Sequence, residues 1–525
     1  MAPIKSVAVI GAGISGVSSA AHLIRHGFEV VVFERSSVTG GVWHFDPRPD
    51  RDPEYPSTEA NHTPDGAVKS KESCEARGED DIALLHAPPG PCYEGLMNNV
   101  PTTMMRTTLL QWPEGTPDHV THHEIETYVQ RLSQETGAHD VTLFDTRVEE
   151  AVKNASTGKW DVRTKTLLKQ GDGKYSFQNK DWTFDAVVVA AGHYHVPLIP
   201  EVPGLAEWKS KYPDRVRHSK SYRYPHHYRD QNVLLIGAGV SSLDIAKELD
   251  GLANKTYQSS RGGIFDLDKS FLPPNSERVA GLKSFKLDEG KSVSSGSETP
   301  GAPIPGTVHL TDGRVLQDIH HVIIASGYQT TYPFLTGLES DSIAAHDADE
   351  SIIITADKCI THNLHKDIVS TIALCLSLSG TIYTDFSFPQ FYMPDPTLTF
   401  VGVPYYTSTF SMFEFQAEVV ARVYAGLATL PSAETMRSEY AARKAKGETG
   451  KAFHSLIRNQ VPYMEDILAW VNEGVNDRGI EPMKGVDEAW YRGYEAFKEK
   501  SKRLIPVDSN QIQQPIASKY YTSEE

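Results

Sequence analysis

Two short glycine patterns, each directly behind an apolar run, constrain this chain more than any other feature of its sequence. The first is Gly11-Ala-Gly13-Ile-Ser-Gly16 after the run 4–10, and the second is Gly237-Ala-Gly239-Val-Ser-Ser242 after the run 233–236. In a strand–turn–helix unit, glycines let backbone N–H groups and the positive helix end approach a pyrophosphate. One such pattern also fits an ordinary strand, turn and helix, so the second pattern is what favours dinucleotide binding.

The first glycine pattern is followed by the other parts of a dinucleotide-binding unit. Helical spacing continues through Val17, Ala20 and Leu23, and the next apolar run, 28–33, ends in Glu34. A carboxylate about 20 residues past the glycines binds the ribose diol of an adenine nucleotide, and it repels a 2′-phosphate. This site is therefore predicted to take FAD or NAD, and FAD is the reading that fits the whole chain. The alternative is a surface charge at a strand end.

The corresponding position of the second unit carries Ser259, Ser260 and Arg261. A guanidinium with neighbouring hydroxyls suits a 2′-phosphate, so the second site is predicted to take NADPH. The alternative is a solvated arginine in the turn before Gly262 and Gly263.

The two units form an imperfect internal repeat, because each ends in a similar strand: VVVAAG at Gly192 and VIIASG at Gly327. The second copy is nested in the first, since chain beyond Gly327 is needed to complete the larger domain. We predict an α/β fold with two Rossmann-like dinucleotide-binding domains, the NADPH domain (205–327) inserted into the FAD domain (1–198 and 330–525). Besides the residues already named, Ser15 and Ser241 are predicted to bind the cofactors. Two dinucleotides in one chain imply electron transfer between them.

Apolar spacing places further elements. A helix is expected over 122–136, and short strands over 141–144, 148–152, 160–164 and 182–184 form a meander joined by a turn at 171–173. A last buried strand is expected over 398–403. Ser411 and Glu414 have the spacing of a capping box that opens a helix reaching Leu427.

Two stretches lack such spacing, and the C-terminal part is helical without evident chemistry. The segment 46–90 is rich in Pro, Asp, Glu and Ser, so it is read as an irregular insertion, either a lid near the active site or a bland loop. The segment 285–306 is expected to be loop. Beyond Pro431 the chain reads as charged helix, with Trp470 and Trp490 as packing anchors.

Composition excludes several classes of function. The chain has 525 residues and a formal net charge of −17, which argues against nucleic acid or an anionic membrane as partner. Its four cysteines contain no CxxC pair, which disfavours a metal site and the dithiol reductases and fits a reducing compartment. No apolar run approaches the ~18 residues of a membrane span. We therefore expect a cytoplasmic enzyme acting on a small molecule, with no metal; a homodimer is compatible with the sequence.

Three further motifs resemble those of a known family. Gly40-Gly41-Val42-Trp43 is similar to a GGxW segment beside an isoalloxazine ring, the stretch 93–101 (YEGLMNNVP) is similar to YxxLxTNxP, and the stretch 192–200 (GHYHVPLIP) is similar to GHYxxPxxP. With the two nucleotide units, these motifs resemble the flavin-containing monooxygenases, a family of class B flavoprotein monooxygenases. The resemblance extends loosely over residues 1–430.

The identifying pattern of that family, FxGxxxHxxx followed by Tyr or Phe, corresponds to residues 212–222. Tyr212 stands in place of Phe and Asp214 in place of Gly, while His218 matches the pattern. The terminal Tyr222 favours the enzymes that oxygenate heteroatoms, whereas a tryptophan there favours the related Baeyer-Villiger enzymes.

The resemblance implies an NADPH- and O2-dependent monooxygenase of the N,N-dimethylaniline type, which oxygenates a nitrogen or sulfur atom through a C4a-hydroperoxyflavin. It also implies that Gly41, Val42, Trp43 and Asn98 contact the flavin, and that Asn99 is the catalytic residue, a buried amide that donates a hydrogen bond. Asn99 as a cap for the turn before Pro101 is the competing interpretation. A Baeyer-Villiger enzyme acting on ketones, a non-oxygenating NADPH oxidase or reductase, and an idle nucleotide sensor remain the alternatives.

Overall fold

The structure is a computed structural model, and it describes most of the chain. The described residues are 3–57, 79–171, 174–263, 265–288, 301–344, 347–356, 358, 364–366, 389–445, 454–456 and 459–501.

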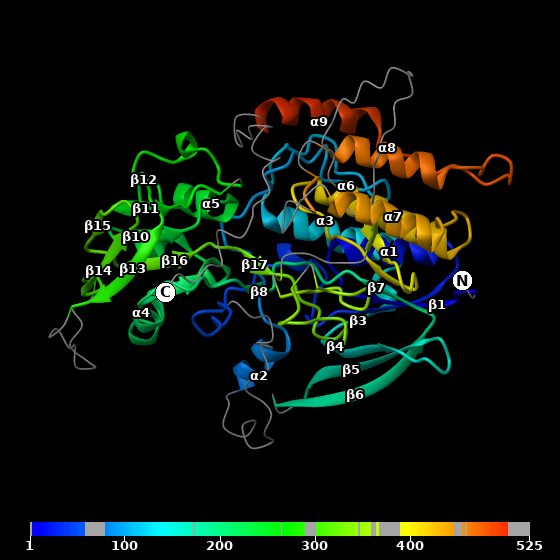
Figure 1. Cartoon of the computed structure of the whole chain (residues 1–525), viewed down its shortest axis with the longest axis horizontal. Helices are drawn as coiled ribbons and strands as arrows, with labels where there is room; N and C mark the ends of the chain where they lie inside the picture. The colour runs from blue at the N-terminus through cyan, green and yellow to red at the C-terminus, as the bar shows by residue number, and fades with distance from the viewer. Residues whose placement is uncertain are drawn as a thin grey trace.

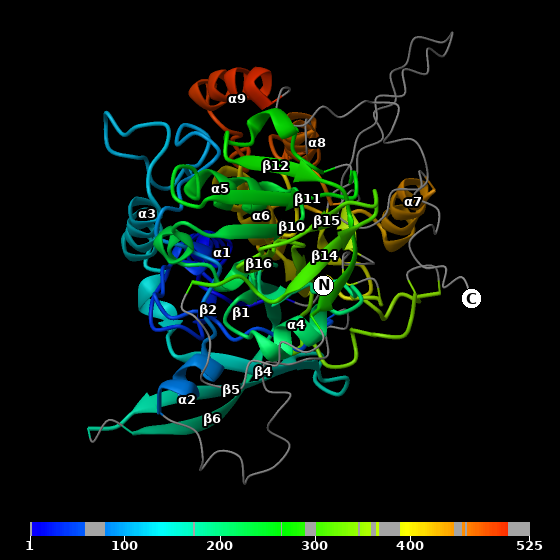
Figure 2. The same ribbon diagram turned by 90° about the vertical axis from the view of Figure 1, so that its left-hand side faces the viewer.

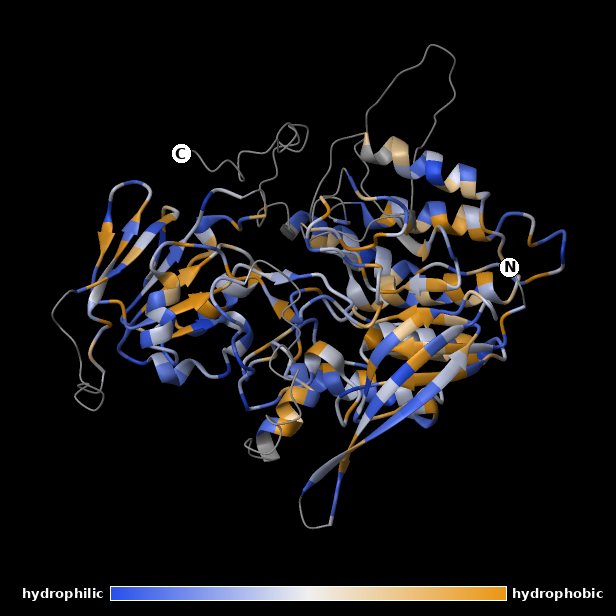
Figure 3. Ribbon diagram, turned by 60° about the horizontal axis from the view of Figure 1, so that its bottom comes forward, coloured by the Kyte–Doolittle hydropathy of each residue, from blue (hydrophilic) through white to orange (hydrophobic). Residues whose placement is uncertain are grey.

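A mixed seven-stranded sheet forms the centre of the larger domain, drawn at the right of Figure 1. Its strand order is β18-β19-β20-β7-β1-β2-β3, and the run from β20 to β3 is parallel. The strands are β1 (Ser6–Ile10), β2 (Glu29–Phe33), β3 (Thr142–Leu143), β7 (Ala186–Val189), β18 (Leu364–Lys366), β19 (Pro389–Tyr392) and β20 (Leu398–Phe400). The central strands are apolar on both faces, as expected when both are covered. Their hydrophobic colour is visible in Figure 3.

Helices cover one face of this sheet. They are α1 (Ile14–Arg25), α3 (His122–Glu135), α6 (Thr409–Tyr424), α8 (Gln460–Val471) and α9 (Glu488–Ser501), with α7 (Ala433–Lys444) beside them. The predicted helices after the first glycines and over 122–136 are thus present. Thr121 and Glu124 form a capping box at the start of α3.

An antiparallel meander covers the other face, as Figures 1 and 2 show below the sheet. It consists of β4 (Thr146–Lys153), β5 (Trp160–Lys169) and β6 (Tyr175–Phe184). Trp182 and Phe184 pack edge to face against Phe33 of the central sheet. The prediction that the strand over 141–144 belongs to this meander is wrong, because β3 pairs in parallel with β2. Whether a strand joins the central sheet depends on the strand with which it pairs. The spacing of apolar residues along the chain does not reveal that pairing.

The smaller domain is built on a five-stranded parallel sheet of order β12-β11-β10-β16-β9. Its strands are β9 (Val216–His218), β10 (Asn232–Ile236), β11 (Lys255–Ser259), β12 (Ser276–Val279) and β16 (His321–Ile324). Helix α5 (Val240–Glu248) packs on one face, while α4 (Leu205–Lys211) and the antiparallel strands β13 (Leu282–Leu287), β14 (Gly306–Leu310) and β15 (Val315–Leu316) pack on the other.

The smaller domain is inserted between β7 and β18 of the larger sheet, which confirms the predicted α/β fold with one nucleotide-binding domain nested in the other. The chain leaves through β8 (Val196–Pro197) and returns through β17 (Tyr328–Gln329). These two strands pair with each other, so the two crossings lie side by side.

Three local predictions need correction. Helix α6 begins at Thr409, and Ser411 lies inside it, where its hydroxyl bonds the carbonyl of Met104 instead of capping. The segment 285–306 is not all loop, because β13 reaches Leu287; residues 289–300 lie outside the described chain. The segment 46–90 contains the helix α2 (Glu79–His86), and its part 58–78 also lies outside the described residues.

The C-terminal helices are anchored as the sequence suggested. Trp490 is 1% exposed, stacks on Tyr494 and donates a hydrogen bond to Ser411 at 2.8 Å, whereas Trp470 is half-buried. Within the part of the chain that is described, no helix combines the length and apolarity of a membrane span.

Trp490→Ala should destabilise the larger domain by about 3 to 5 kcal/mol, since it empties a core site and leaves Ser411 without a donor. Urea titration of the FAD-loaded protein, following helix content, measures this. Trp470→Ala is the matched control, and a loss as large as that of Trp490→Ala would show that burial in α9 is not what anchors the C-terminal helices.

Candidate functional site

One cavity of about 2670 Å3 opens between the two domains, and both glycine turns line it. Small-molecule pockets are typically ~300–1,000 Å3, so this cavity has room for more than one ligand. Nearly all predicted site residues line it: Gly11, Gly13, Ser15, Glu34, Gly41, Val42, Trp43, Asn98, Asn99, Gly192, Gly237, Gly239, Ser241, Ser259, Arg261 and Gly327. Gly16 and Ser242 do not, and they lie behind the turns.

The first glycine turn is shaped by close contact with the end of β7. Gly11 has φ +104°, and a Cβ there would lie 2.6 Å from the carbonyl oxygen of Ala190. A Cβ at Gly16 would lie 1.8 Å from the carbonyl oxygen of Gly11, which explains why α1 can start so close to the turn. Helix α1 has no side-chain cap and no acid in its first turn, so its N–H groups remain available for an anion.

The second turn repeats this arrangement against the end of β16. Gly237 has φ +112°, and a Cβ there would lie 2.5 Å from the carbonyl oxygen of Ala325. Helix α5 also begins without a side-chain cap. At the position matching Gly16, Ser242 accepts a hydrogen bond from Gln258 at 2.8 Å, which ties α5 to β11.

Glu34 lies at the end of β2 and is 8% exposed. Its carboxylate accepts the N–H groups of Ala12 at 2.7 Å and of Ser36 at 2.9 Å. A carboxylate can accept about four hydrogen bonds, so it braces the glycine turn and retains acceptor capacity toward the cavity. This geometry fits a ribose diol.

The Gly40–Trp43 segment packs directly on the first turn. Gly41 has φ +59°, and a Cβ there would lie 2.8 Å from the Cα of Gly13. Trp43 packs edge to face on Phe410 with ring centroids 6.5 Å apart. The segment therefore walls the cavity next to the helix end that would hold a pyrophosphate.

The two adjacent asparagines differ in their surroundings. Asn98 is 4% exposed; its amide donates to the carbonyls of Val100 at 2.7 Å and Asp118 at 2.8 Å, and its oxygen accepts the N–H of Val120 at 2.6 Å. The expectation that Asn99 is buried is wrong: Asn99 is exposed on the cavity wall. The turn before Pro101 is held by the amide of Asn98.

The residues predicted to bind a 2′-phosphate are only partly available. Ser259 is buried and donates to the carbonyl of Ala280 at 2.9 Å, and the hydroxyl of Ser260 bonds the carboxylate of Asp266. The same carboxylate accepts the N–H of Gly263 at 3.0 Å. Arg261 is exposed on the cavity wall, and no described residue hydrogen-bonds its guanidinium. Asp266 thus occupies donors that an incoming phosphate would use.

Tyr222, the residue that distinguishes the two oxygenase classes in the resemblance, does not line the cavity. It is 2% exposed, and its hydroxyl donates to Glu248 of α5 at 2.8 Å. Burial raises the pKa of Glu248. A tryptophan has no hydroxyl group with which to donate this hydrogen bond to Glu248. Tyr222 therefore influences the site by holding α5 in place.

Several residues of the cavity wall could not be predicted from the sequence. Phe265 of the smaller domain stacks on Tyr406 of the larger one, with centroids 4.8 Å apart and planes at 17°. Helix α9, where no chemistry was expected, contributes Tyr494, Phe497 and Lys498 to the wall. These contacts join distant parts of the chain, and the residues carry no local motif that could have revealed them.

Comparisons with known proteins agree with this geometry. The family model described as Flavin-binding monooxygenase-like matches residues 89–272, and an NAD(P)-binding Rossmann-like domain model matches residues 9–68. The chain is 40% identical over 518 residues to flavin-containing monooxygenase ustF2 of Aspergillus flavus (95% of this chain, 98% of the relative). It is 34% identical to ustF1 of the same organism over 98% of this chain and 94% of that one. The solved S-allyl-L-cysteine S-oxygenase of Allium sativum shares the fold with a TM-score of 0.65 at 22% identity, covering 96% and 94% of the two chains.

The contact of Gly41 with Gly13 yields a test of the first site. The purified protein should be yellow with bound FAD, and Gly41→Ala should lose most of it, because the added Cβ is strained at φ +59° and displaces the turn. Absorbance and released FAD measure the content. Gly90→Ala is the control, since a Cβ there would meet Val42 only at 4.0 Å. Folded wild-type protein that takes up no FAD would contradict a flavin site altogether.

Proposed function

The chain belongs to the flavin-containing monooxygenase family, and we propose that it uses NADPH and O2 to oxygenate a nucleophilic nitrogen or sulfur atom of a small molecule. The observation that carries the proposal is that two uncapped helix ends, one in each domain, open into one cavity. A chain that binds two dinucleotides in one cavity would be suited to moving electrons between them.

The bound FAD and NADPH supply the hydride transfer and the activation of O2, while the protein supplies binding, orientation and shielding from water. In the larger domain, the end of α1 would hold the pyrophosphate of FAD and Glu34 its ribose. In the smaller domain, the end of α5 would hold the pyrophosphate of NADPH and Arg261 its 2′-phosphate. The stacked pair Phe265 and Tyr406 would keep water from the region between the domains.

Asn99 is proposed as the hydrogen-bond donor beside the reacting groups. Its position on the cavity wall, next to the fixed Asn98, supports this role. A neutral amide can donate without changing protonation state, so the site needs no acid–base pair of side chains.

A small neutral or cationic substrate fits the net charge of −17. Four cysteines without a CxxC pair fit a cytoplasmic enzyme. The choice between nitrogen and sulfur is tested by screening amines, thioethers such as S-allyl-L-cysteine, and ketones for NADPH consumption with product identification. N- or S-oxides support the proposal. Lactones or esters formed from ketones would instead establish a Baeyer-Villiger enzyme. Hydrogen peroxide without any oxygenated product would establish an oxidase.

Arg261→Ala should weaken NADPH binding by about 1.5 to 3 kcal/mol and leave NADH binding nearly unchanged, because the lost bond is charge-assisted. Titration of the FAD-loaded enzyme with both nucleotides measures this, and equal losses would show that Arg261 does not bind the phosphate.

Asp266→Asn should have the opposite effect. Removing its charge should strengthen NADPH binding by about 0.5 to 1 kcal/mol, with NADH unaffected, since the carboxylate competes with the phosphate for Ser260 and Gly263. Asp268→Asn is the matched control: Asp268 caps the next turn by accepting the Ser270 N–H at 2.7 Å, and it does not line the cavity. Weaker NADPH binding in Asp266→Asn would contradict the competition.

Asn99→Ala should still oxidise NADPH but release hydrogen peroxide in place of oxygenated product, because the donor beside the reacting groups is gone. The ratio of peroxide to product measures it. Asn98→Ala should instead lower thermal stability by leaving the backbone groups of Val100, Asp118 and Val120 without partners, with the ratio preserved in the surviving enzyme. An unchanged ratio in Asn99→Ala would rule out the role.

A further inference from the structure

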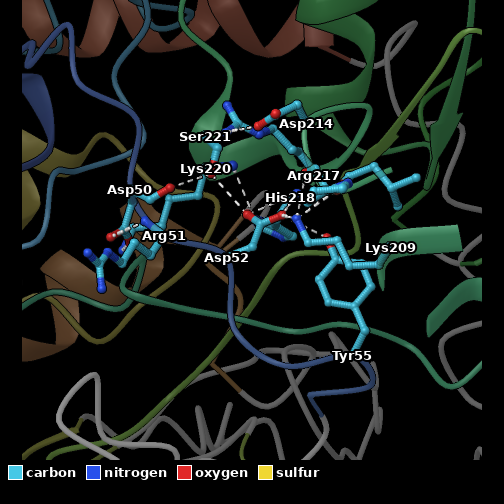
Figure 4. Close-up of polar contacts among 12 residues, drawn as sticks. Asp50, Arg51, Asp52, Tyr55, Lys209, Asp214, Arg217, His218, Lys220 and Ser221 are labelled. Carbon is cyan, nitrogen blue, oxygen red and sulfur yellow. Dashed lines mark hydrogen bonds and ion pairs between the residues drawn. The ribbon is translucent and has the colours of Figure 1, made fainter. Parts of the chain in front are cut away.

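The first part of the irregular segment, residues 46–57, runs from the larger domain to the beginning of the smaller one. There it meets α4, β9 and the short helix η4 (Ser219–Ser221). Figure 4 shows the side chains that meet there. The sequence predicts either a lid or a bland loop for this segment, and neither prediction includes the contacts that it makes.

Asp52 is the centre of this contact, with a side chain 5% exposed. Its carboxylate accepts hydrogen bonds from Lys209 Nζ at 2.9 Å, from the Ser221 hydroxyl at 3.0 Å, from the His218 N–H at 3.1 Å and from the Tyr55 hydroxyl at 2.9 Å. A buried carboxylate is tolerated only when it is paired and its acceptors are satisfied. Three of the four donors belong to α4, β9 and η4, so one side chain fixes three elements at the start of the smaller domain.

A second connection joins the same segment to the outgoing crossing. Lys220, 3% exposed at its side chain, pairs with Asp50 and donates to the carbonyl of His195 at 2.8 Å. His195 precedes β8, through which the chain leaves the larger domain. Burial lowers the pKa of Lys220, and the Asp50 carboxylate opposes that shift. Breaking this pair would therefore leave a buried charge without compensation.

A third connection reaches the returning crossing. The N–H of Lys220 donates to Nδ1 of His218 at 3.1 Å, so Nε2 carries the ring proton and donates to the carbonyl of Gly327 at 3.1 Å. Burial lowers the pKa of His218 to about 4, which keeps the ring neutral and this tautomer fixed. Gly327 directly precedes β17, through which the chain returns.

Arg223 completes the contact without any carboxylate. Its guanidinium donates to the carbonyls of Asp46 at 2.7 Å, Arg48 at 3.2 Å, Gly90 at 3.1 Å, and Lys220 and Tyr222 at 2.8 Å each. All five guanidinium N–H groups thus hold backbone. Arg223 therefore binds both ends of the segment 46–90 and the backbone at Lys220 and Tyr222.

We propose that Asp52 is a positioning residue for hydride transfer, because it holds β9 and η4, whose His218 and Lys220 bond the two crossings, and it therefore sets the angle between the nucleotide-binding domains. The inference rests on the proposed function. Hydride transfer requires reacting atoms ~3 to 3.5 Å apart, and a displacement of 1 Å costs on the order of 10²-fold in rate. Domains joined by two strands move relative to each other by default unless an interface restrains them. The segment 46–57 provides that restraint.

Asp52→Asn keeps the size of the side chain but removes the charge and places an amide among four donors. The limiting rate constant for reduction of the FAD-loaded enzyme by NADPH should fall on the order of 10²-fold, with FAD content and the Kd for NADPH little changed. Stopped-flow absorbance without oxygen measures both constants. The control is Asp214→Asn between α4 and β9, whose side chain is 88% exposed and pairs with Arg217 at 3.2 Å; it should stay within roughly twofold of wild type.

Hydrogen exchange gives a readout that does not depend on turnover. In the FAD-loaded Asp52→Asn protein without NADPH, peptides containing Leu198 should exchange faster, because the Leu198 N–H donates to the Gly327 carbonyl across the crossings at 3.0 Å. Peptides from β1 and α1 should be unchanged. A merely destabilised protein would instead exchange faster throughout.

The inference is overturned if folded Asp52→Asn is reduced at the wild-type rate, or if its NADPH Kd rises by the same factor as the rate falls. If Asp52→Asn does not fold, Ser221→Ala removes one donor to Asp52 and should slow reduction in the same direction, by up to about tenfold; an unchanged rate there overturns the inference as well. Wild-type enzyme that NADPH does not reduce overturns the proposed function too, so the two failures are distinguishable.

Discussion

The close approach of a glycine turn to the end of a neighbouring strand is the constraint on which both nucleotide sites depend. Gly11 lies under the carbonyl of Ala190, and Gly237 lies under the carbonyl of Ala325, each at a φ that side chains rarely adopt. This contact brings the following helix so near the sheet edge that its first N–H groups face the cavity instead of a cap. The unsatisfied helix ends are stable only with an anion or water against them, so each domain is preorganised for a pyrophosphate.

The sequence could predict whatever depends on near neighbours along the chain. The strand, the glycines, α1 and Glu34 lie within about 30 residues, the length of one βαβ unit, so their spacing alone places them together. The nested second copy follows from the same spacing repeated. Asn98 and Asn99 show the limit of such reasoning: Asn99 matches the motif and Asn98 replaces its threonine, but only the carbonyls of Val100 and Asp118 decide which of the two is held in place.

The spacing of residues along the chain did not predict the contacts between distant segments. The pairing of β3 with β2 and the bond of Ser411 to Met104 each depend on geometry that no local spacing encodes. The irregular segment is the clearest case, because its composition suggests a loop, yet Asp52 has a side chain only 5% exposed. Charged residues in a segment without periodicity can be buried when the elements that they contact, here α4, β9 and η4, supply their hydrogen-bond partners.

The glycine turns and the polar contacts around Asp52 have different roles in the molecule. The glycine turns are rigid and local, so they fix each cofactor within its own domain, whereas Asp52, Lys220 and His218 act between the domains. Because the second set consists of polar contacts around two paired strands, its loss need not unfold either sheet. Tyr222 illustrates the same separation, since it holds α5 through Glu248 without lining the cavity. Residues that hold α4, β9, η4 or α5 in place can therefore affect the reaction through the placement of a bound nucleotide, without touching it.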